Sequence, residues 1–189
     1  MRPTTDPWEG RFTAPVRIAA LALVGAVVGC MAAGVAHATT LVPMDLRTLS
    51  TRADAVVVAR CIDVRSEVDP ATHIVVTTTR FAVDQAVKGA GASREVVVRL
   101  PGGAAEGRAT VLADVPSFSA GATAVLFLSA ARSDGSRGIL GLSQGSFAVS
   151  GGSNGQVVHA TAPEHGGSGE SVDGVPLADF LTTVRAYLR

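Results

Sequence analysis

The stretch Ala55-Val56-Val57-Val58-Ala59-Arg60-Cys61-Ile62-Asp63-Val64 carries the strongest structural signal in the chain. Its first half is a continuous run of small and β-branched residues, which is typical of a strand that is buried on both faces. A strand of this kind lies between neighbouring strands, because an edge strand would expose part of the run to water. Residues 55–64 therefore predict the central strand of a β domain.

The flanking sequence predicts more strands, with one helix before them and one after. Further strands are predicted over residues 74–87, 96–100, 110–112, 124–128, 138–142, 146–149 and 156–160. Asp45 can cap a short helix over residues 46–53, and apolar residues at helical spacing follow Pro176 over 177–188. With no βαβ alternation, the predicted fold is mainly β (α+β), a small antiparallel barrel or sandwich that is OB-like.

A hairpin is predicted late in the chain. Asn154-Gly155 is a type I′ turn sequence, and it would pair residues 147–150 with residues 156–160. The predicted organisation is a signal peptide over 1–38, a β-barrel-like domain over 39–160, a flexible loop over 161–175 and a C-terminal helix over 176–189 that packs on the domain.

Composition limits the classes of function. The chain has 189 residues, with 16 Lys and Arg against 16 Asp and Glu. This balance lacks the basic excess of nucleic-acid binders and of proteins that bind anionic membrane surfaces. Hydrophobic residues make up 47% of the chain and charged residues 17%, so it has enough apolar surface to fold.

The N-terminal segment has the pattern of an export signal. Three arginines precede an uncharged run over residues 18–35, and Ala36-His37-Ala38 follows as a small-x-small cleavage site. We therefore expect cleavage after Ala38 and a secreted or periplasmic location. Two alternatives stay open: residues 18–35 could remain as an uncleaved membrane anchor, or Cys30 could be lipidated as in a lipoprotein.

Removal of residues 1–38 would leave 13 basic and 14 acidic residues and a single cysteine, Cys61. The mature chain could then form no intramolecular disulfide, and its stability would come from an ordinary core. Cys61 lies within an apolar strand with no histidine nearby in sequence. We expect a buried thiol rather than a nucleophile.

Gly141-Leu142-Ser143-Gln144-Gly145 matches the G-x-S-x-G motif of serine hydrolases. In such enzymes a strand-to-helix turn exposes the serine, and an acid and then a histidine follow along the chain. Residues 146–149 instead read as strand, and no histidine follows Asp173 or Asp179. A glycine-rich strand bend is the favoured interpretation, and a serine hydrolase that uses Ser143 is the alternative.

No other constellation indicates an enzyme, a metal or a cofactor. His73, His159 and His165 could join Glu164 around a metal ion, but their spacing fits no ligand pattern. Pairs of carboxylates at the end of the predicted central strand, Asp63 with Glu67 or Asp69, are interpreted as surface charges. The sequence therefore predicts no cofactor, no metal site and no catalytic residues.

Several blocks of sequence share an order with known proteins: RADAVVVARCIDV at 52–64, TTTRFAV and AVKG within 77–89, VVVRLPGG at 96–103, VLFL at 125–128 and GLSQGSF at 141–147. This order resembles a class of secreted bacterial proteins of unknown function. The layout also resembles the OB-like barrel of netrin-type and metalloprotease-inhibitor domains. Those inhibitors use a disulfide-held N-terminal cysteine, whereas the mature chain would begin at Thr39, so that mechanism does not transfer.

The leading hypothesis is an exported, non-catalytic binding module of unknown ligand, with a secreted protease as one candidate partner. An unknown protein partner is expected, with no nucleic acid and, after cleavage, no membrane. The alternatives are the hydrolase that uses Ser143 and an envelope-tethered structural protein, held by a lipid on Cys30 or by an uncleaved N-terminal helix.

Overall fold

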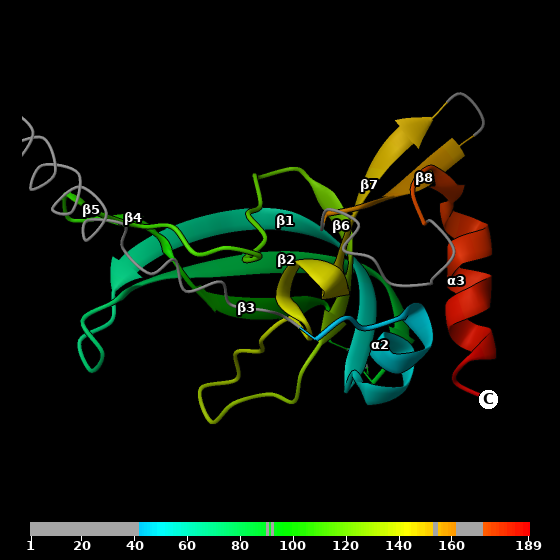
Figure 1. Ribbon diagram of the computed structural model, residues 1–189, viewed down its shortest axis with the longest axis horizontal. Coiled ribbons are helices and arrows are strands. Elements are labelled where there is room, and N and C mark those ends of the chain that lie inside the picture. The colour runs from blue at the N-terminus through cyan, green and yellow to red at the C-terminus, as the bar shows by residue number, and fades with distance from the viewer. Residues whose placement is uncertain (1–41, 90, 92, 153–154, 162–171) are drawn as a thin grey trace, which may run out of the picture. The chain divides into compact units, whose positions relative to one another are not determined.

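The computed structural model describes residues 42–89, 91, 93–152, 155–161 and 172–189. These residues form α2 (Leu46–Arg52), β1 (Ala55–Val68), β2 (Val75–Lys88), β3 (Glu95–Pro101), β4 (Gly103–Ala105), β5 (Arg108–Thr110), β6 (Thr123–Leu128), the 3-10 helix η1 (Leu142–Gly145), β7 (Ser146–Gly152), β8 (Gly155–Ala160), β9 (Val175–Pro176) and α3 (Leu177–Ala186) (Figure 1). Seven strands form one antiparallel sheet in the order β3-β2-β1-β6-β7-β8-β9, and β4 pairs with β5 separately. This arrangement confirms the predicted mainly β fold class, with a helix before the strands and one after them.

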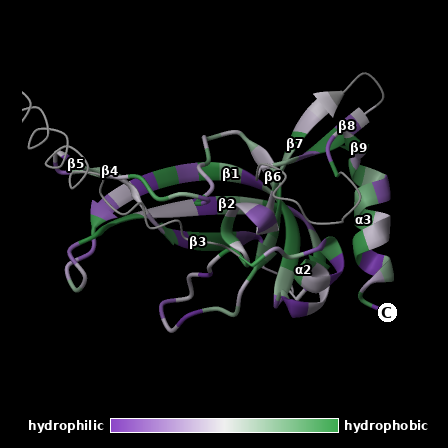
Figure 2. Cartoon of the chain, in the orientation of Figure 1, coloured by the Kyte–Doolittle hydropathy of each residue, from purple (hydrophilic) through white to green (hydrophobic). Residues whose placement is uncertain are grey.

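Strand β1 is central, as the run at residues 55–64 predicts. Val57 is fully buried in a cluster on one face of β1 and β6, and Val56 is fully buried in a second cluster on the other face. The strand alternates between the two clusters because successive side chains point to opposite faces. Burial ends after Cys61, and the outer half of β1 carries more hydrophilic residues (Figure 2).

Both helices cover the second face. Leu49 of α2 and Phe180 of α3 are each 1% exposed in this cluster. Phe180 lies 5.0 Å from Phe147 and 6.5 Å from Phe127, measured between ring centroids. Aromatic pairs at such distances contribute about 0.5–1.5 kcal/mol beyond the area that they bury. The amphipathic C-terminal helix therefore packs on the sheet.

A short segment connects β3 with β6 on the side of the first cluster. The backbone N–H of Arg137 donates to the Val97 carbonyl (2.8 Å), and the N–H of Ser129 donates to the Gly138 carbonyl (3.0 Å). Among the described residues, only single bridges form here, at Arg137 and Ile139, so the sheet as described does not close into a continuous barrel. The strand predicted over 138–142 is reduced to this contact because Gly141 and Leu142, with φ of 67° and 54°, turn the chain into η1.

The junction between α2 and β1 is held by Lys88 and Gly89. The Lys88 ammonium donates to the Ser50 and Thr51 carbonyls at 3.0 and 2.9 Å, near the C-terminus of α2. A Cβ atom at Gly89 would lie 1.8 Å from the Asp54 carbonyl oxygen, so only glycine fits. The Val-Lys-Gly block is thus explained by contacts with the residues that begin β1.

The chain near residues 110–112 and 175–176 also differs from the sequence-based expectation. Thr110 is the last residue of β5 and pairs with Gly103, and beyond it the described part of the chain offers no partner strand. Val111 and Leu112, predicted as strand, are therefore exposed by 93% and 43%. In addition, Val175–Pro176 pairs with β8 as β9, which is too short for a sequence pattern to mark.

The predicted signal peptide, the cleavage site after Ala38 and Cys30 lie outside the described residues, as does Asn154 of the predicted turn. Most of the predicted flexible loop, residues 162–171, lies outside them too. Within the described ranges, no helix has the length and apolar character needed to cross a membrane.

Candidate functional site

The GLSQG motif forms a tight turn that ends in η1. A Cβ atom at Gly145 would lie 2.0 Å from the Leu140 carbonyl oxygen, so the turn requires glycine at this position. The Gln144 side chain accepts a hydrogen bond from the Met44 N–H (2.8 Å) and donates one to the Val42 carbonyl (3.3 Å). The motif therefore has a structural role in this turn, which agrees with its interpretation as a glycine-rich bend.

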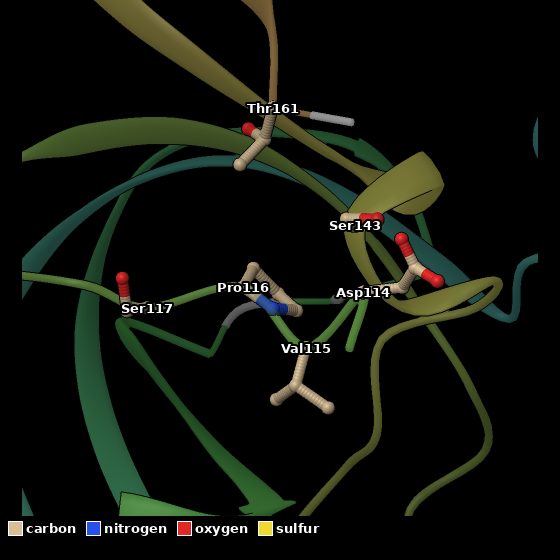
Figure 3. Close-up of a pocket in the computed structure, with 6 residues that line it drawn as sticks. All are labelled: Asp114, Val115, Pro116, Ser117, Ser143 and Thr161. Carbon is tan, nitrogen blue, oxygen red and sulfur yellow. The ribbon is translucent and has the colours of Figure 1, made fainter. Parts of the chain in front are cut away.

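Ser143 also forms part of the wall of a pocket of about 400 Å³. Three segments meet there: η1, the loop between β5 and β6, and the end of β8. The lining residues are Asp114, Val115, Pro116, Ser117, Ser143 and Thr161. Figure 3 shows Thr161 across the opening from Pro116, with the side chains of Ser143 and Asp114 beside each other at one side.

Contacts at Asp114 and at Phe118 hold the loop that lines the pocket. The Ser143 N–H donates to the Asp114 carbonyl at 2.9 Å. Asp114 has a φ of 60°, a left-handed conformation that is uncommon outside glycine. Phe118 of the same loop packs edge-on against Phe81 with ring centroids 5.0 Å apart. The pocket is therefore built on the core rather than on a free loop.

Two serine hydroxyls at this site are buried and unpaired. Ser143 is 5% exposed and Ser146 is 1% exposed, and neither Oγ has a hydrogen-bond partner among the described residues. An unsatisfied buried hydroxyl costs about 1–3 kcal/mol. No described histidine is bonded to the Ser143 Oγ.

A second cluster was missed by the sequence analysis. The Ser150 Oγ lies 3.0 Å from His159 Nε2, and His159 Nδ1 lies 2.9 Å from Asp173 Oδ1. The predicted hairpin already placed Ser150 and His159 on facing strands. Nothing in the sequence indicated Asp173, because the sequence analysis assigned residues 161–175 to a loop.

The other histidines and acids considered for a metal site do not assemble in the part of the chain that is described. There, no group of three or more His, Cys, Asp and Glu side chains could hold a metal ion. His73 lies in the turn between β1 and β2, where its N–H donates to the Asp69 carbonyl. Glu164 and His165 lie outside the described residues.

The carboxylates at the outer end of β1 form ion pairs. Asp63 contacts Arg65 at 2.9 Å, and Asp69 contacts Arg99 at 2.7 Å. Hydrogen bonds from the turn backbone, first that of Thr72, hold the pKa of Asp69 below its ordinary value. A carboxylate with a lowered pKa remains charged and is a poor proton donor, which agrees with the interpretation as surface charges.

Cys61 is 1% exposed in the first apolar cluster, as predicted. Burial raises the pKa of its thiol. A thiol with a raised pKa is a poor nucleophile because the thiolate is the reactive form. Cys61 is therefore part of the core.

Comparison with known proteins returned no family model and no curated protein that matches the chain. A function has to be argued from the site itself, because a fold alone does not define one. The described residues offer two places for such an argument, the pocket at Ser143 and the cluster at His159.

Proposed function

We propose that the protein is exported, with cleavage after Ala38, and acts as a binding module for another protein outside the cytoplasm. The signal-like N-terminal pattern supports export. A pocket and two exposed apolar residues on the loop that lines it support binding. The neutral charge balance favours a protein as the partner over a polyanion.

The observation that carries this proposal is the pocket of about 400 Å³ beside the GLSQG turn. Ligand sites combine apolar walls with a few polar groups that fix orientation. Here Val115 and Pro116 supply apolar surface, and Ser117 and Asp114 supply a hydroxyl and a carboxylate. A partner group that donates hydrogen bonds, such as a backbone or side-chain amide, fits this set.

An exposed apolar pair lies in the same loop as the pocket lining. Val111 and Leu112 are exposed by 93% and 43%, and Ala113 separates them from Asp114, the first lining residue. Exposed apolar residues that gather at one place mark interaction surfaces. A secreted protease is one candidate partner, since the chain resembles inhibitor domains, although it would engage this surface rather than an N-terminal cysteine.

Capture of the partner tests the proposal. The full chain is expressed in a bacterial host, and the exported protein is immobilised and exposed to an extracellular or periplasmic fraction. A specific partner should be retained, and the double variant Val111→Ser with Leu112→Ser should lose it. Ile74→Ser is the matched control, because Ile74 is 45% exposed in the turn between β1 and β2. Equal retention by the double variant, or no retention by the unmodified protein, would contradict the proposal.

The export step has its own test. Mass spectrometry of the exported protein should find Thr39 as its first residue. A lipid on Cys30 or an intact segment 18–35 would instead favour the envelope-tethered alternative.

A further inference from the structure

Ser150, His159 and Asp173 form a hydrogen-bonded chain on one face of the β7–β8–β9 edge. Ser150 belongs to β7 and His159 to β8, whereas Asp173 precedes β9. The hydroxyl lies 3.0 Å from Nε2 of the imidazole, and the carboxylate lies 2.9 Å from Nδ1. Nε2 of the imidazole is thus paired with a hydroxyl, and Nδ1 is paired with a carboxylate.

The sheet register places the three side chains. Ala148 pairs with His159 and Ser150 with Val157, so Ser150 and His159 are diagonal neighbours on the same face. The Gly174 N–H donates to the Val158 carbonyl at 2.8 Å, which holds the residue after Asp173 against β8. The cluster is therefore held by backbone ladders rather than by the side chains alone.

The chemistry follows from the two partners of the imidazole. A carboxylate can only accept, so the neutral ring carries its proton on Nδ1 and leaves Nε2 free to accept the Ser150 hydroxyl proton. A nucleophile bonded to a base that a third group orients is the pattern of covalent catalysis, and it is recognised by geometry rather than by chain order.

We propose that Ser150 is a nucleophile that accepts the acyl group of carboxylic esters, with His159 as its general base and Asp173 as a positioning residue. The Ser150 Oγ forms a bond to the carbonyl carbon while its proton passes to Nε2. The carbon–oxygen bond to the leaving alcohol then breaks, and the alcohol takes that proton. Water attacks the acyl-serine in the same way and releases the acid.

The site is open, which limits the rate that we expect. The side chains of His159 and Asp173 are exposed by 39% and 63%. His159 Nε2 is the hydrogen-bond partner of the Ser150 Oγ among the described residues. We therefore expect the general-base contribution of this pair, on the order of 10²-fold. This inference goes beyond the proposed binding function and uses a different set of residues.

A fluorophosphonate probe tests the nucleophile directly, because the serine oxygen displaces fluoride from phosphorus. With the exported protein from the full chain, we expect the probe on Ser150, located by peptide mass spectrometry. Ser150→Ala should abolish this labelling and His159→Gln should slow it by about 100-fold, whereas Ser133→Ala, at an exposed serine in the loop after β6, should label at the unmodified rate. Labelling of Ser150→Ala at the unmodified rate, or no labelling of the native protein, would overturn the proposal.

The role of Asp173 needs a readout that a purely structural contact would not move. Nitrogen NMR of the imidazole should find the neutral His159 with its proton on Nδ1, and Asp173→Asn should weaken this preference and slow labelling by about 10-fold. Asp173→Glu should restore part of both. A proton on Nε2 in the native protein, or unchanged labelling in Asp173→Asn with unchanged thermal unfolding, would remove Asp173 from the proposal.

Discussion

Two serines seven residues apart in the chain lie in opposite settings. Ser143 has the motif of a hydrolase but is buried, and its Oγ has no partner among the described residues. Ser150 has no motif, yet its Oγ lies 3.0 Å from a histidine that a carboxylate orients. The G-x-S-x-G pattern at Ser143 therefore reflects a local turn, whereas the register of the sheet brings Ser150 close to His159.

The largest expected effect tests the turn at Ser143. Gly145→Ala should destabilise the protein by about 3 kcal/mol, because the new Cβ would lie 2.0 Å from the Leu140 carbonyl oxygen. Gly151→Ala, next to Ser150, is the matched control. A Cβ there meets nothing within 4 Å, and we expect a change within about 0.5 kcal/mol. Urea unfolding measures both variants, and equal midpoints would refute the structural assignment of the motif.

A second prediction concerns the side chain next to Ser143. Gln144→Ala should cost about 1 kcal/mol, because it removes the hydrogen bonds to Met44 and Val42. The Met44 amide should also exchange its hydrogen faster. Gln85→Ala is the control, since Gln85 is exposed on β2. Unchanged exchange at Met44 would mean that Gln144 does not hold residues 42–44.

The third prediction is a gain of stability, whereas the first two predictions are losses. Ser143→Ala should stabilise the free protein by about 1 kcal/mol, because it removes a buried hydroxyl without a partner. Calorimetry measures this effect. A destabilised Ser143→Ala would indicate that the hydroxyl is already satisfied in the free protein.

The smallest expected effect on stability is at Ser150. Ser150→Ala should leave the free energy of unfolding within about 0.5 kcal/mol, because the side chain is exposed. Its reactivity with the fluorophosphonate should nevertheless be lost. A large loss of stability together with the loss of labelling would make the hydrogen-bonded chain a structural feature instead.

The central strand and the helices could be predicted because their signals are local. The run at residues 55–64 is apolar on both faces, and the apolar residues of 177–188 recur at helical spacing. Chain turns set by positive φ, as at Leu142, leave no periodic signal, and the predicted strand over 138–142 was therefore too long.

The two sites depended on tertiary contacts. The pocket needs the loop at Asp114 beside Ser143, and no pattern links these residues. Ser150 and His159 could have been paired from the predicted hairpin by strand alternation alone. Asp173 could not, because the two-residue strand that follows it is visible only once β8 is in place.

The contact of Lys88 with α2 has a practical consequence for experiments that couple the protein to a resin or a crosslinker. Lys88 is the single lysine of the chain, and its amine is held by the Ser50 and Thr51 carbonyls. Amine-reactive resins and crosslinkers would find only this group and the chain terminus, and coupling at Lys88 would release the helix end. Attachment through a C-terminal tag would leave the contact of Lys88 with α2 intact.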